Sequence, residues 1–233
     1  MKSRRCFAWL GVVFLVAFAA PGGSQPPPTR VAILVYDGVY NTEFIAPLDV
    51  FDHAISHTGG RLKVFTVAPS SGAVTTAEGL RILPQYTFAT SPTIDWLVVP
   101  SGKNYRADVE NKTLVSWVRA VGRKAKVVHS NCWGAFLLGA AGLLDGKQAT
   151  TFPASLDEFA QLYPRVRVRR DVHLVDDNGA VTSAGGVVSY DAALHLVERH
   201  FGREVARKVA TGLVIDWDAR RSRYQNAGAP LRP

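Results

Sequence analysis

Cysteine is scarce in this sequence, and its scarcity excludes a disulfide-based fold. Cys6 and Cys132 are the only two cysteines among 233 residues. Cys6 lies in an N-terminal segment that we expect to be removed, so Cys132 has no partner for an intramolecular disulfide. An unpaired thiol in an oxidising compartment is reactive, binds a metal or is simply buried.

Long apolar runs are also absent. The apolar run over residues 7–20 follows a basic start and is shorter than the roughly 20 residues that a membrane span needs. This pattern predicts an export signal over residues 1–20, cleaved near Ala19 or Ala20. Residues 3–7 also resemble a twin-arginine signal. We therefore expect an exported protein, periplasmic or secreted, with no stable membrane span after cleavage; the alternative is an uncleaved N-terminal anchor.

The part of the chain that we expect to fold carries no excess of positive charge. The formal net charge is +8, but residues 31–218 contain as many acidic as basic residues. The surplus lies at the start of the chain and in residues 219–233, which we expect to form a basic, disordered tail. A neutral body argues against a nucleic-acid partner, and the alternating segment Arg165–Arg170 is typical of an exposed strand face.

Motifs for a cofactor or a metal are absent as well. The sequence has no phosphate-binding loop and no glycine fingerprint of a dinucleotide-binding fold, so we expect no cofactor. His53 and His57 have the spacing of zinc ligands on one helix face, but no third ligand accompanies them, and we expect no metal site. His173, in an expected strand, has no discernible partner.

What the sequence does contain is an alternation of strands and helices, identified from apolar runs, hydrophobic periodicity and the positions of glycine and proline. Expected strands cover residues 31–36, 62–68, 94–100, 127–130, 166–175 and 180–183. Expected helices cover residues 46–56, with Pro47 in the first turn, and 112–121, 133–141, 155–162, 190–201 and 204–213. After a linker over residues 21–29, this order predicts one domain over residues 30–218. The expected fold is a three-layer αβα sandwich with a mostly parallel, flavodoxin-like sheet.

At Cys132 a short apolar strand turns into an apolar helix. A residue at such a turn has the geometry of a nucleophile elbow: its side chain is exposed above the sheet, and helical N–H groups point at it and favour the thiolate. The alternative is a small buried side chain, because free cysteines are among the most buried residue types. The elbow favours a functional thiol.

Three segments follow expected strands and carry polar side chains. They are Asp37–Glu43, Ser101–Asn104 and Asn131–Gly134. Ligands of open α/β sheets bind outside the carboxyl ends of the strands, so the three segments predict a single site.

Motifs in a fixed order surround these segments, at residues 36–51, 98–102, 131–146, 149–151, 182–186 and 191–197. Together they resemble the ThiJ/PfpI family, in the class I glutamine-amidotransferase-like superfamily, over roughly residues 30–217. Within that family the chain is most similar to the branch that contains isonitrile hydratases and the N-terminal ligand-sensing domains of AraC-type regulators. Because the chain ends at Pro233, we expect no DNA-binding region of the kind that follows the sensing domain in those regulators.

The resemblance implies a set of site residues. Cys132 is the implied nucleophile and Glu43 the acid beside it. Gly102 and Trp133 are implied to offer backbone N–H groups to a developing anion. Two other acids compete for the role of Glu43: Asp37 and Asp49. The resemblance also implies a homodimer.

Two residues depart from the family pattern. Phe152 stands where many relatives have a histidine near the nucleophile, so the commonest general base is missing. Trp133 stands where the residue after the nucleophile is often small or hydroxyl-bearing, and its indole narrows the site. His129 is a possible substitute base, but its position three residues before Cys132 on a strand is more typical of a core or dimer-face histidine.

These features predict an exported enzyme that uses Cys132 on a small molecule, by isonitrile hydration or related hydrolase or lyase chemistry. Two alternatives stay open. One is a non-catalytic sensor that binds a small molecule in a pocket lined by Trp133 and Phe152. The other is a thiol redox sensor.

Overall fold

Apolar runs form the centre of the sheet. The computed structural model describes residues 26–217 and 224–226. The strands β1 (Thr29–Leu34), β2 (Leu62–Ala68), β6 (Trp96–Val99) and β7 (Val127–Asn131) pair in parallel, in the order β2-β1-β6-β7. No side chain from Val31 to Val35 is accessible to solvent, because both faces of a parallel sheet are covered.

Four shorter strands complete a main sheet of eight strands among the described residues. β11 (Ala180–Ser183) joins β7 in parallel, and β10 (Leu174–Asp177) joins β11 in antiparallel fashion. β12 (Tyr224–Asn226) joins β10, and β5 (Tyr86–Thr87) joins β2 at the other edge. Two small sheets lie apart from it: β3 (Val74–Thr75) with β4 (Arg81–Ile82), and β8 (Gln148–Ala149) with β9 (Arg167–Val168).

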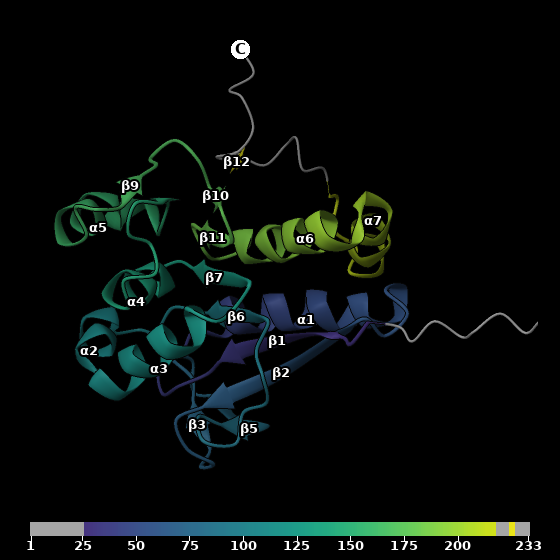
Figure 1. The fold of residues 1–233 in the computed structure, drawn as a ribbon, viewed down its shortest axis with the longest axis horizontal. Coiled ribbons are helices and arrows are strands. Elements are labelled where there is room, and N and C mark those ends of the chain that lie inside the picture. Colours follow the sequence, from purple (N-terminus) through teal and green to yellow (C-terminus); the bar gives the residue numbers. More distant parts are fainter. Residues whose placement is uncertain (1–25, 218–223, 227–233) are drawn as a thin grey trace, which may run out of the picture.

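Helices cover the two faces of the sheet (Figure 1). α1 (Asn41–His57), α6 (Val188–Phe201) and α7 (Arg203–Gly212) pack together on one face. α2 (Tyr105–Glu110), α3 (Lys112–Gly122) and α4 (Gly134–Ala140) pack together on the other. The short helix η1 (Pro153–Ser155) leads into α5 (Leu156–Leu162), which packs beside β9. The predicted three-layer sandwich with a mostly parallel sheet is confirmed.

The first helix begins earlier than the sequence predicts. α1 starts at Asn41, so Pro47 lies inside the helix and not in its first turn. Because proline has no N–H, the carbonyl of Glu43, four residues earlier, loses its helical donor. Asn131 Nδ2 donates to this carbonyl instead, at 2.9 Å. The proline therefore allows the end of β7 to be tied to the first turn of α1.

The expected strand over residues 166–175 is wrong. Its first part forms β9, which pairs with β8, and its last part forms β10 in the main sheet. The alternation of valine and arginine is compatible with pairing in either sheet. The point at which one strand ends and the next begins therefore depends on which strands they pair with. All four arginines between Arg165 and Arg170 make ion pairs, among them Arg165 with Asp145 and Arg170 with Asp157, as suits an exposed face.

The two ends of the chain are described in part. Residues 1–20, the expected export signal, lie outside the described residues. Of the segment expected to be a disordered tail, Tyr224–Asn226 instead form β12, and the rest lies outside the described residues. Within the described ranges no helix is both long enough and apolar enough to cross a membrane.

Candidate active site

Cys132 lies at the turn between β7 and α4, as the sequence predicts. Its φ of 53° is in the left-handed region, which few residues other than glycine adopt and which often marks a functional site. Two hydrogen bonds hold the residue there. Its N–H donates to Ser183 O at 3.0 Å, and its carbonyl accepts from Thr151 Oγ1 at 2.8 Å. The backbone of Cys132 is therefore fixed by two segments distant in sequence.

The loop after β11 lies against the thiol. Gly185 in this loop has a φ of +84°, and a Cβ atom at this position would lie 2.3 Å from Cys132 Cβ. Only glycine permits both this backbone conformation and such a close approach. The loop therefore forms one wall of the site directly beside the sulfur.

Glu43 is buried beside the same loop, in the first turn of α1. Only 5% of its surface is exposed. Its Oε1 accepts a hydrogen bond from Gly186 N at 2.8 Å, and its Oε2 accepts one from Ser189 Oγ at 3.1 Å. Burial raises the pKa of Glu43 above its ordinary value, although both hydrogen bonds oppose the rise. Of the three acids that the sequence left in competition, Glu43 is the one that contacts the elbow region.

The other two acids lie elsewhere. Asp37 Oδ1 accepts a hydrogen bond from Thr75 N at 2.8 Å, and the carboxylate of Asp49 lies 3.4 Å from His53 on the surface of α1. Neither residue lines the cavity that contains Cys132.

The thiol of Cys132 is neutral in this site. Burial raises its pKa to about 12, and the negative charge of Glu43 adds to the rise. Hydrogen bonds from the Ser101 side chain and the Trp133 backbone N–H lower the pKa by less. The Trp133 N–H at the start of α4 does favour the thiolate, as the sequence predicts, but desolvation outweighs it.

The three segments predicted to form one site do converge. Val39 and Gly102 form an isolated bridge, and Tyr40 N donates to Ser101 O at 3.0 Å. Together with the hydrogen bond from Asn131 to Glu43, these contacts place the segments together at the carboxyl ends of β1, β6 and β7. The position agrees with the general rule for ligand sites in open α/β sheets.

Cys132 and Glu43 line a cavity of about 430 Å³. This volume suits a small-molecule ligand. Most of its remaining lining is aromatic, apolar or backbone: Tyr40, Trp133, Phe152, Pro153, Ala184, Gly185, Gly186 and Val188. Gly102 does not line it, but follows Ser101, which hydrogen-bonds the thiol.

Trp133 and Phe152 form the aromatic side of this cavity, as expected. Their rings meet edge to face with centroids 5.7 Å apart, and 39% of Phe152 is exposed. Trp133 Nε1 donates to Ser155 Oγ at 2.8 Å, which holds the indole in one orientation. The cavity wall at position 152 is therefore apolar.

His173 also lines the cavity, and the sequence did not identify it. It lies just before β10, in the connection from β9 that was expected to be continuous strand. Its carbonyl accepts from Ala184 N at 2.8 Å, so it extends the pairing of β10 with β11 towards the elbow. No local pattern marks this residue, because its position follows from the break between two sheets.

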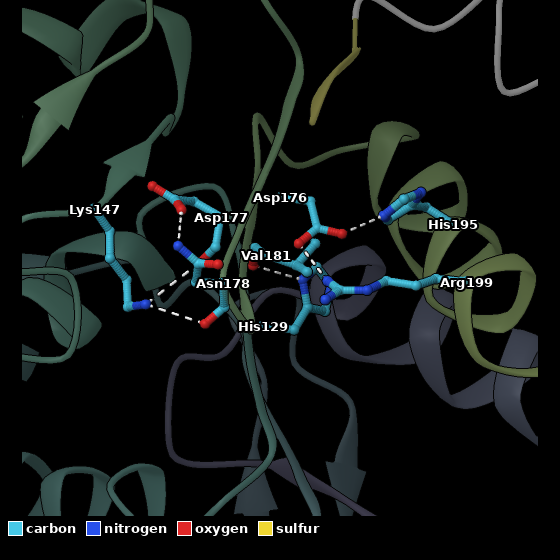
Figure 2. A network of polar contacts seen from close by, with 8 residues as sticks. All are labelled: His129, Lys147, Asp176, Asp177, Asn178, Val181, His195 and Arg199. Carbon is cyan, nitrogen blue, oxygen red and sulfur yellow. Dashed lines mark hydrogen bonds and ion pairs between the residues drawn. The ribbon is translucent and has the colours of Figure 1, made fainter. Parts of the chain in front are cut away.

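His129 is not the substitute base. It is completely buried on β7, with Nδ1 3.0 Å from Val181 O, and burial lowers its pKa to about 4. Figure 2 shows it beside a buried ionic cluster in which His195 and Arg199 of α6 contact Asp176 of β10. His195 Nε2 lies 2.7 Å from Asp176 Oδ2. His129 therefore belongs to the core, as its strand position suggested.

The described residues contain no group of three or more His, Cys, Asp or Glu side chains arranged to hold a metal ion. His53 is engaged with Asp49, its neighbour one helical turn away. His57 lies at the end of α1 and lines a separate surface cleft with α7.

Known proteins resemble this chain in sequence and in structure. Residues 29–199 match the DJ-1/PfpI family. The chain is 30% identical over 180 residues to isonitrile hydratase of Pseudomonas putida, an alignment that covers 77% of this chain and 75% of the hydratase. It is 26% identical over 202 residues to the HTH-type transcriptional regulator GbdR of Pseudomonas aeruginosa, covering 84% of this chain and 54% of the regulator.

A solved structure agrees with these relatives. The crystal structure of a ThiJ/PfpI family protein from Pseudomonas syringae superposes with a TM-score of 0.72 at 28% identity, over 82% of this chain and 76% of that one. The chain thus spans about three quarters of the hydratase and about half of the regulator. The family match over most of the described residues shows that this chain belongs to the DJ-1/PfpI family.

Proposed function

We propose that this protein is a cysteine-dependent enzyme that hydrates a small isonitrile or carries out a related hydrolase or lyase reaction. The observation that carries the proposal is the shared cavity: the Cys132 thiol and the buried Glu43 carboxyl both line a largely apolar space of about 430 Å³. A small isonitrile is uncharged and carries an apolar substituent, which suits this lining. The 30% identity to isonitrile hydratase supports the choice.

The proposed reaction begins with Cys132. Its sulfur adds to the terminal carbon of R–NC: the S–H bond breaks, a C–S bond forms, and the carbon gains a proton to give R–N=CH–S–Cys. Water then adds to this carbon, nitrogen gains a proton, and the C–S bond breaks to release R–NH–CHO and the thiol. A neutral resting thiol suits the first step, because the substrate carbon takes up the proton that sulfur loses.

Glu43 and two backbone amides complete the proposed machinery. Glu43 transfers protons to and from the adduct, a role suited to a carboxyl whose pKa burial has raised. The Trp133 N–H, which hydrogen-bonds the thiol, stabilises negative charge as it develops; the Gly102 N–H is given the same role from the family resemblance, although Gly102 does not line the cavity. Trp133 and Phe152 hold the apolar group of the substrate.

The test measures formamide production from a panel of alkyl and aryl isonitriles. Cys132→Ser is expected to abolish turnover, and Glu43→Gln to reduce kcat by about 10²–10⁴-fold. Asp49→Asn is the matched control, since this acid lies on the same helix but does not line the cavity. Unchanged turnover in both Cys132→Ser and Glu43→Gln contradicts the proposal.

A ligand-binding sensor without catalysis is the second candidate. The aromatic pair Trp133 and Phe152 favours it, because an apolar pocket without a histidine at that position can hold a ligand without converting it. Similarity to GbdR supports it too. A ligand that co-purifies with the protein, together with no thiol-dependent turnover, would favour this function. Redox sensing is less well supported, since oxidation requires thiolate and the pKa of Cys132 is about 12.

We propose further that the protein is exported and acts as a homodimer. Export rests on the basic and apolar pattern of residues 1–20. Cell fractionation with intact-mass measurement of the N-terminus tests it, and an uncleaved chain in the membrane fraction would support the alternative of an anchor. Light scattering coupled to size exclusion tests the dimer.

A further inference from the structure

The proposed site lacks an obvious acceptor for the proton of Cys132. Both oxygens of Glu43 already accept hydrogen bonds, from Gly186 N and from the Ser189 hydroxyl. The adjoining Phe152 is apolar, and His129 is buried in the core. A group that can take a proton near neutral pH must therefore come from another part of the cavity wall.

His173 lies in this part of the cavity wall. The chain has six histidines, and in the described part of it His173 is the one that lines the cavity of Cys132. Its side chain is exposed, so its imidazole can exchange protons with solvent. The His173 carbonyl accepts a hydrogen bond from Ala184 N at 2.8 Å. Gly185, the residue after Ala184, lies against Cys132 Cβ. The imidazole is thus attached to the wall that touches the nucleophile.

We infer that His173 is the proton acceptor for Cys132 in this cavity, acting directly or through one water molecule. The inference rests on the proposed function. As the C–S bond forms, the imidazole takes the S–H proton and returns it to the isonitrile carbon. Glu43 then takes a proton from the attacking water and delivers it to nitrogen. When the C–S bond breaks, the hydroxyl proton of the adduct returns to sulfur, so the histidine ends each cycle neutral.

The charged groups around His173 are compatible with this role. The other titratable groups that line the cavity are Tyr40, Glu43 and Cys132. Along its own segment the neighbouring charges are compensated: Arg169 lies 3.7 Å from Asp171, and Arg170 pairs with Asp157 of α5. Histidine is the common general base of enzymes that work near neutral pH.

The test compares His173→Gln with His57→Gln, an exposed histidine at the far end of α1. Two readouts are followed from pH 5 to 9: isonitrile turnover, and the rate at which iodoacetamide alkylates Cys132. His173→Gln is expected to lower kcat/KM by about 10²-fold or more and to remove the histidine limb of the pH profile. Added imidazole is expected to restore part of the activity, and His57→Gln to behave as wild type. Thermal melting checks that both variants are folded.

The two readouts separate this inference from the proposed function. If the wild-type protein converts no isonitrile, the proposed function is contradicted. The inference about His173 is then tested by the alkylation rates alone. The inference is supported if the alkylation rate of wild type changes with pH as a histidine titrates and this change is lost in His173→Gln. Identical alkylation profiles, or turnover in His173→Gln equal to that in His57→Gln, overturn it.

Discussion

At the scale of single residues, the pKa of the Cys132 thiol is set by neighbouring groups, some of which raise it while others lower it. Glu43 lies on one side and, together with burial, disfavours the thiolate, while Ser101 and the Trp133 amide stabilise it. A pKa of about 12 results. The surroundings of Cys132 therefore favour the neutral thiol, so the proposed attack by sulfur requires transfer of its proton.

This balance predicts how Cys132 reacts with iodoacetamide. With a pKa of about 12, roughly one thiol in 10⁴ is ionised at pH 8, so alkylation is expected to be far slower than that of free cysteine. Glu43→Gln removes a negative charge, lowers the pKa of the thiol and is expected to accelerate alkylation several-fold at pH 8–9. Asp49→Asn is the control and should leave the rate unchanged. Equal rates for wild type and Glu43→Gln would show that the two groups do not interact.

Gly185 supplies a second prediction at this scale. In Gly185→Ala the new methyl group would meet Cys132 Cβ at 2.3 Å in a backbone conformation with φ of +84°. We expect a loss of about 2–4 kcal/mol in the free energy of unfolding and strongly reduced turnover, because strain and overpacking add.

Gly186→Ala is the matched control for the neighbouring position. Gly186 has a φ of +60°, but no atom lies within 4 Å of the point that a Cβ would occupy. The alanine there carries the backbone strain without the clash. Urea denaturation of both variants measures the difference. If the two variants are equally stable, the close approach at Gly185 does not constrain the site.

At the scale of secondary structure, α1 and β7 are joined through the proline. Asn131 fills the hydrogen bond that Pro47 leaves open at the Glu43 carbonyl, and Asn131 Oδ1 accepts from Ser183 Oγ at 2.7 Å. One buried amide thus links α1, β7 and β11, the three elements that hold the acid, the thiol and the glycine loop. This link explains why the polar side chain of Asn131 is buried at the end of β7.

The link predicts a coupling between residues 47 and 131. Asn131→Ala is expected to cost about 2 kcal/mol, because the Glu43 carbonyl and the Ser183 hydroxyl lose their partner in the core. In a Pro47→Ala background the helix regains an N–H for that carbonyl, so the same change should cost less. A double-mutant cycle by urea denaturation measures the difference, and additive effects would contradict the proposed role of Pro47.

Some element boundaries follow from the sequence and others do not. The strand before Cys132 and the turn at Cys132 were predicted because an apolar β-branched run and a helix signal meet there. The start of α1 was misplaced, since Pro47 normally marks a first turn, and here a side chain from a distant strand compensates for the missing donor. The division of residues 166–175 was missed because its two halves differ only in their pairing partners.

At the scale of the whole molecule, the cluster of Asp176, His195 and Arg199 joins β10 of the main sheet to α6 (Figure 2). Burial raises the pKa of Asp176, but His195 and Arg199 outweigh this effect, and the pKa lies below its ordinary value. A carboxyl whose pKa is lowered on folding stabilises the protein above its unfolded pKa. That stabilisation is lost as the pH falls through the lower, folded pKa.

Asp176→Asn is therefore expected to reduce the free energy of unfolding by about 3 kcal/mol at pH 7, because a charge partner is removed from a buried cluster. The difference from wild type should shrink as the pH falls below about 4, near the ordinary pKa of an aspartate. Turnover per folded molecule should be retained, since Asp176 does not line the cavity. Urea denaturation between pH 3 and 7 measures this, and a difference that does not change with pH would exclude the ionic contribution.

The sequence alone predicted the layered fold and the elbow at Cys132. The family resemblance of its motifs added Glu43, Trp133 and Phe152, which line the cavity, and Gly102, which does not. Hydrophobic periodicity, strand-to-helix turns and short motifs are local, so they can be read along the chain. The neutral state of the thiol, the position of His173 and the bond from Asn131 to Glu43 were decided by folding. Each depends on desolvation or on contacts between segments distant in sequence, and such contacts exist only once the sheet has brought those segments together.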